Sequence, residues 1–111
     1  MIDMLLLALL AGNASYEPPP QVWYHQAVGC GASAMAEKGD GDPSPDLAGE
    51  LMTWGLVLAD TGRKAGRTRK QVDDADIRAA IPFYSRLKDR KPPAFAAHRS
   101  YCRALLEAER G

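Results

Sequence analysis

The chain has 111 residues, with 14 basic side chains, 14 acidic side chains and two cysteines. This length allows one domain with a modest hydrophobic core. A net charge of zero excludes a chain that is basic throughout, as many nucleic-acid-binding domains are, and two cysteines allow at most one internal disulfide.

The N-terminus has the pattern of an export signal. Met4–Ala11 is an uninterrupted apolar run, and Gly12–Ala14 supplies the small residues that a signal peptidase needs. We therefore expect residues 1–14 to be a cleaved secretory signal peptide and residues 15–111 to form a single helical domain. A retained first helix or a short membrane anchor is the alternative. The apolar run is about half the length of a membrane-spanning helix, so we expect no transmembrane helix in the mature chain.

The first helix is predicted over Pro20–Lys38. Its apolar face has the helical spacing i, i+4, i+7 and i+11, formed by Trp23, Ala27, Cys30 and Ala34. A break at Gly29–Gly31 is the alternative, because each glycine inside a helix costs about 1 kcal/mol relative to alanine. Gly39–Pro43 is expected to end the helix and form a loop.

A second helix is predicted over Pro45–Thr61. Ser44 is a suitable N-cap, Pro45 is a suitable first residue, and Gly62 is expected just beyond the end of the helix. The residues expected to face the core are Leu47, Leu51, Trp54 and Leu58, with Ala48, Met52 and Ala59 beside them.

A third helix is expected to begin between positions 69 and 74 and to run to Lys88. Thr68 and Gln71 have the spacing of a capping box, and Asp73 is an equally plausible N-cap. Pro82 lies in the middle of the pattern, removes one backbone hydrogen bond and clashes with the preceding turn. We therefore expect a kink close to this proline, or two short helices that meet there.

A fourth helix is predicted over Pro93–Arg110. Its expected buried side contains Phe95, His98, Cys102 and Leu105. The chain lacks alternating strand patterns and hairpin signals. The predicted fold is therefore all-α, a small bundle of about four helices.

The two cysteines lie in the first and last of these helices. In an exported chain Cys30 and Cys102 are expected to form a disulfide that joins the first helix to the last. The alternative is a metal site made by these cysteines with His25 and His98, since two histidines and two cysteines can bind zinc. His25 and Cys30 are about 140° apart on a helix, so they could converge only if the glycine-rich segment unwinds. We therefore predict the disulfide, no metal and no cofactor.

Charge is unevenly distributed along the chain. Residues 15–60 carry seven acidic and one basic side chain, whereas residues 61–111 carry six acidic and thirteen basic side chains. This pattern indicates either two halves with complementary packing surfaces or a basic surface that meets an anionic partner. The candidate patch for such a partner consists of Arg63, Lys64, Arg67, Arg69 and Lys70. A solvated loop between helices is the alternative interpretation of these residues.

The sequence contains no phosphate-binding loop and no recognised catalytic motif. The preferred hypothesis is a non-enzymatic binding or interaction protein, periplasmic or secreted, with an accessory, inhibitor or chaperone-like role. Its partner would be a protein or an anionic component of the cell envelope. The alternative is a cytosolic nucleic-acid-binding or regulatory domain that uses residues 63–70, although no aromatic residue interleaves with the basic run to stack on bases. A small enzyme that uses His25 and His98 is a third hypothesis.

Overall fold

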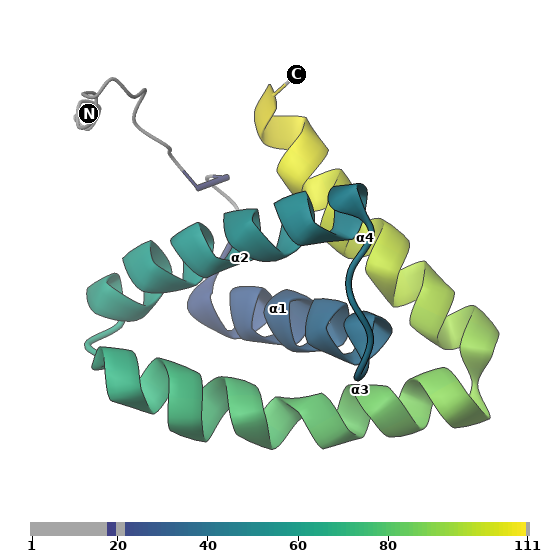
Figure 1. Cartoon of the computed structure of the whole chain (residues 1–111). Coiled ribbons are helices and arrows are strands. Elements are labelled where there is room, and N and C mark those ends of the chain that lie inside the picture. The colour runs from purple at the N-terminus through teal and green to yellow at the C-terminus, as the bar shows by residue number, and fades with distance from the viewer. Residues whose placement is uncertain (1–17, 20–21, 111) are drawn as a thin grey trace.

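The computed structural model describes residues 18, 19 and 22–110, and in this part of the chain it contains four α-helices, one π-helix and no strand (Figure 1). The all-α bundle predicted from the sequence is confirmed. The predicted signal peptide, residues 1–14, lies outside the described residues. The elements are α1 (Tyr24–Lys38), α2 (Pro45–Lys64), η1 (Gln71–Ile77), α3 (Arg78–Arg90) and α4 (Pro92–Arg110).

Helix α1 is the central element of the bundle. It lies between α2 and α3 (Figure 1), and α4 packs across its middle, where Cys102 is bonded to Cys30. A helix that is surrounded in this way needs small residues on most of its faces, because its neighbours approach it closely. Its buried residues are Ala27, Cys30, Gly31, Ala32, Ser33, Ala34 and Ala36.

Helix α1 is continuous, and the break considered at Gly29–Gly31 is absent. The helix begins at Tyr24, four residues later than predicted, because the backbone of Trp23 is extended and its N–H donates to Gln26 Oε1. A β-carbon at Gly31 would lie 2.9 Å from Leu58 Cδ1, so this glycine allows α2 to pack closely against α1.

Helix α2 begins as predicted, since Ser44 Oγ accepts a hydrogen bond from the Leu47 backbone N–H. It continues to Lys64, so the prediction that Gly62 lies beyond the helix end is wrong. A β-carbon at Gly62 would lie 2.8 Å from Val72 Cγ2. This glycine is therefore a packing residue inside the helix.

The capping box predicted before the third helix is present. The Thr68 backbone N–H donates to Gln71 Oε1, and the Gln71 backbone N–H donates to Thr68 Oγ1. Helix α3 is continuous through Pro82, so two short helices do not meet at this proline. A departure from regular α-helical geometry lies ahead of α3, in the π-helix η1. The i→i+5 bonding of a π-helix turns residues five positions apart toward the same side. This geometry brings both Val72 and Ile77 to the hydrophobic core.

The core is centred on Trp54, Val57 and the two cysteines, with contributions from α1, α2, η1 and α4. Trp54 is buried, as predicted from its place in the apolar stripe of α2. Three residues that we expected to face the core do not do so: two lie on α2, which packs through one face only, and the third precedes α1. Met52, Ala59 and Trp23 are all exposed.

Candidate functional site

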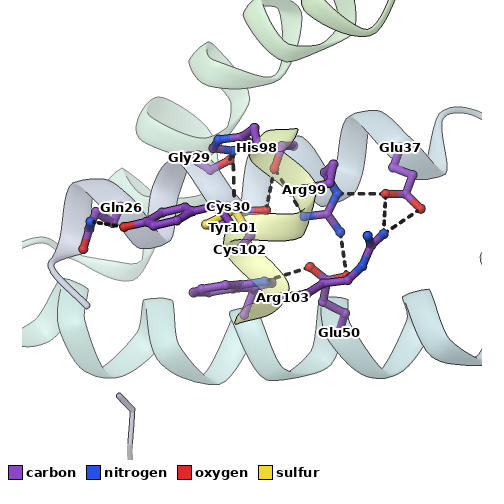
Figure 2. The surroundings of a disulfide bond; sticks show 12 residues. Gln26, Gly29, Cys30, Glu37, Glu50, His98, Arg99, Tyr101, Cys102 and Arg103 are labelled. Atoms are coloured by element: carbon purple, nitrogen blue, oxygen red, sulfur yellow. Dashed lines mark hydrogen bonds and ion pairs between the residues drawn. A yellow bond between two sulfur atoms is a disulfide. The ribbon is translucent and has the colours of Figure 1, made fainter. Parts of the chain in front are cut away.

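Cys30 and Cys102 form a disulfide that links α1 to α4, as the sequence predicts (Figure 2). Their Cα atoms are 5.5 Å apart, which is within the range that a disulfide spans, and both residues are buried. The bond connects positions that are 72 residues apart in the sequence. It therefore closes most of the described chain into one loop.

His98 lies directly beside the disulfide. Its Nε2 atom is 3.4 Å from Cys102 Sγ and 3.4 Å from the Gly29 carbonyl oxygen (Figure 2). The Tyr84 ring stacks on the imidazole with 4.7 Å between the ring centres. Burial lowers the pKa of His98 below its ordinary value, so the imidazole is neutral at neutral pH.

The four residues considered as a metal site do not all converge. Cys30, His98 and Cys102 place their potential ligand atoms within 4.8 Å of one another. His25 is exposed and does not belong to this group. Because α1 is continuous, His25 and Cys30 point in different directions, as the sequence predicts.

A partly buried ion-pair network lies one helical turn from the disulfide. Arg99 has only 2% of its side chain exposed, and its guanidinium donates to Glu37 at 2.8 Å and to Glu50 at 2.6 Å (Figure 2). Arg103 reinforces the network at 3.0 Å from Glu37 and 3.4 Å from Glu50. The Trp54 indole N–H also donates to Glu50, at 3.1 Å. The network joins α1, α2 and α4 through charge-assisted hydrogen bonds.

These contacts connect the acidic half of the chain to the basic half. Glu37 and Glu50 belong to the first half, whereas Arg99 and Arg103 belong to the second. Lys88 also donates to the Ala36 carbonyl oxygen near the end of α1. Part of the charge asymmetry is therefore used inside the fold.

The five cations of the candidate anionic-partner patch all have acidic neighbours. Their ion pairs are Arg63 and Lys64 with Asp60, Arg67 with Asp76, Arg69 with Asp73, and Lys70 with Asp74. All of these pairs are at 3.1 Å or less, and four of the five cations are largely exposed. Exposed pairs of this kind contribute little to stability.

Arg67 differs from the other four because it belongs to a structural cluster. Its guanidinium donates two hydrogen bonds to Asp76, and the Tyr24 hydroxyl donates a third at 2.6 Å. The bond from Arg67, followed by the bond from Tyr24, lowers the pKa of Asp76. Burial and the neighbouring carboxylate raise the pKa of Tyr24 to about 12. This cluster holds α1, η1 and the loop after α2 together.

A separate candidate binding surface is the α2 outer face, which we define as Gly49, Met52, Gly55, Leu56 and Ala59. Met52 is 72% exposed and Leu56 is 50% exposed, one turn apart. A β-carbon added at Gly49 or Gly55 would meet no atom within 4 Å. The outward side of a surface helix is normally polar, but these five positions carry no charge.

Sequence reasoning missed Arg99 and Glu50, although a signal was present. Arg99 lies between Phe95 and Cys102 in the apolar stripe of α4, and Glu50 lies between Leu47 and Trp54 in that of α2. A charge at a core-facing position of each helix is a sign of a buried pair.

Comparison of the chain with protein-family models, with curated proteins and with solved structures finds no match. Within residues 18, 19 and 22–110, none of the helices combines the length and the apolar character that crossing a bilayer requires.

Proposed function

We propose that this protein is a non-enzymatic binding protein of the periplasm or the extracellular space, with an accessory, inhibitor or chaperone-like role, and that it binds a partner protein through the α2 outer face. The observation that carries the proposal is the exposure of Met52 and Leu56, one turn apart, on a stretch of α2 surface that carries no charge before Asp60 and Arg63. An exposed apolar patch on a soluble protein is typical of an interaction site. Methionine is common at such surfaces because its flexible side chain adapts to the partner.

The small residues of the face indicate what kind of partner fits. Gly49, Gly55 and Ala59 surround the two large side chains and leave open space beside them. A partner helix with an apolar stripe could approach the α2 backbone closely there and enclose Met52 and Leu56. An amphipathic helix of another protein is therefore the proposed ligand.

The disulfide supports the proposed location. A buried disulfide forms and persists in oxidising compartments and is rare in the cytosol of most organisms. The test is the intact mass of the protein from its own cell, measured before and after reduction and alkylation. We expect a chain that begins near Ser15 and is two hydrogens lighter than the dithiol. A chain that retains residues 1–14 and has two free thiols would contradict the proposal.

The binding face is tested with a photoreactive amino acid at position 52, introduced into the full-length gene in its own cell. We expect one discrete crosslinked protein whose capture is abolished when Leu56→Glu is added. The matched control is Ala96→Glu at an exposed position of α4, which should leave the crosslink unchanged. If position 52 gives no discrete crosslink, or if Leu56→Glu and Ala96→Glu act alike, the proposed face is wrong.

The alternative, a nucleic-acid-binding domain that uses residues 63–70, has less support because all five cations already have acidic neighbours. It predicts binding that weakens steeply as salt increases. Absence of binding to single- or double-stranded nucleic acid at low salt would remove it.

A further inference from the structure

The cluster of Cys30, His98 and Cys102 combines three metal-ligating side chains in the core of the bundle. The two sulfur atoms come from α1 and α4, and the His98 imidazole lies one turn before Cys102 on the same helix. All three potential ligand atoms lie within 4.8 Å of one another. In the oxidised protein the sulfurs are bonded to each other and have no free thiolate for a metal.

We propose that reduction of this disulfide creates a zinc site with Cys30, Cys102 and His98 as its three protein ligands. Two thiolates and one imidazole form a donor set that suits Zn²⁺, with water in the fourth position. The reductant is a dithiol, which becomes a disulfide as it transfers two electrons and two protons to the cysteines. Zinc then replaces the two thiol protons, which are released to the solvent.

The surroundings of His98 hold its ring in place for this role. Stacking on Tyr84 fixes the plane of the imidazole, and Nε2 already faces the Cys102 sulfur. The imidazole binds a metal through a ring nitrogen that carries no proton. Zinc binding through Nε2 places the ring proton on Nδ1, so the contact of Nε2 with the Gly29 carbonyl is replaced by the metal bond.

The test is a titration of the full chain with Co²⁺, which absorbs visibly when thiolates bind it. The protein is used oxidised and after reduction with a phosphine that does not compete for metal. We expect one Co²⁺ per reduced chain, with thiolate-to-cobalt absorption that Zn²⁺ abolishes, and no such absorption from the oxidised protein. His98→Ala should weaken binding by about tenfold or more, since even loss of an outer-shell partner has an effect of this order. His25→Ala is the matched control and should bind as the wild type does.

Circular dichroism of each sample distinguishes loss of the site from loss of the fold. If the reduced chain loses helix, the proposal predicts that stoichiometric Zn²⁺ restores it, because metal binding and folding are coupled. Three results would overturn the proposal: no thiolate-to-cobalt absorption, a reduced chain that zinc fails to refold, or equal metal affinity in His98→Ala and His25→Ala.

Discussion

Replacement of Arg99 should cost the protein much of its stability. Its guanidinium is enclosed by protein and pairs with Glu50, which has only 8% of its side chain exposed. Arg99→Leu would leave this carboxylate with the Trp54 indole N–H and the longer contact to Arg103 as its partners, and would lower the free energy of unfolding by about 3 kcal/mol. Urea unfolding followed by circular dichroism measures the loss. Arg86→Leu, at an exposed position of α3, is the control and should change the value by less than about 0.5 kcal/mol.

The shape of the Arg99 side chain matters as well as its charge. One guanidinium reaches Glu37 through Nε and Glu50 through NH2. Lysine carries a single point of charge and cannot make this fork, so Arg99→Lys should also destabilise the protein, by less than Arg99→Leu does. If Arg99→Lys matched the wild type in the same urea experiment, charge alone would account for the network.

His98 should make the stability of the oxidised protein depend on pH. Burial places its folded-state pKa below the ordinary value of 6.5, so the unfolded chain binds more protons in the interval between the two. The contribution of the neutral His98 imidazole to the free energy of unfolding is fully present above pH 6.5 and is lost as the pH falls through the folded-state pKa. Melting temperatures measured from about pH 7.5 to about pH 5.5 should therefore fall with pH in the wild type.

In His98→Gln the melting temperature should fall less than in the wild type between about pH 7.5 and about pH 5.5. His25→Gln serves as the comparison because His25 is exposed and its replacement should leave the wild-type slope unchanged. Parallel curves for the wild type and His98→Gln would mean that the buried imidazole is not the titrating group.

At the level of helices, the same substitution should have opposite effects on the two sides of α2. Gly62→Ala places a methyl group 2.8 Å from Val72 Cγ2 and 3.2 Å from the Tyr24 ring, both rigid groups, so we expect a loss of about 1–3 kcal/mol. Gly55→Ala points into open space and should add about 0.5–1 kcal/mol, because alanine reduces the entropy of the unfolded chain. Thermal unfolding of both variants measures the difference, and two effects of the same sign would contradict the close crossing of α2 and η1.

The helices themselves were largely predictable, because their signals are local. Ser44 and the Thr68–Gln71 pair mark two helix starts in the sequence, and both form the expected hydrogen bonds. Gly62 was misplaced because a glycine after an apolar stripe has the same appearance whether it ends a helix or admits a neighbour. Only the position of Val72, from a distant segment, distinguishes the two cases.

The exposure of the α2 outer face was not predictable for a related reason. Met52 and Ala59 widen the apolar stripe in sequence, and we expected them to be buried. Their exposure depends on how many elements cover α2, and in the described structure α1 is its main neighbour. The pairing of Arg99 with Glu37 and Glu50 likewise requires three helices to meet, so the sequence indicates the charges but not their partners.

At the scale of the whole molecule, the disulfide connects the central helix to the last one. A bridge between residues 72 positions apart restricts the unfolded chain, and the loop-entropy relation assigns it about 4 kcal/mol. That is a large part of the stability of a domain of this size. The double variant Cys30→Ala/Cys102→Ala should therefore unfold at much lower urea concentration than the oxidised wild type.

A reductant separates the contribution of the bridge from that of the cysteine side chains. The wild type should lose about the same 4 kcal/mol when it is reduced in metal-free buffer, whereas the double variant should not respond. If the variant and the reduced wild type both stay within about 1 kcal/mol of the oxidised protein, the ion-pair network and the packing around α1 hold the helices without the bridge. If only the variant is destabilised, the cost comes from the space left by the two sulfur atoms, since Cys30 and Cys102 are both buried. If the bridge stabilises the protein as proposed, the free energy of unfolding should fall by a similar amount in the reduced wild type and in the double variant.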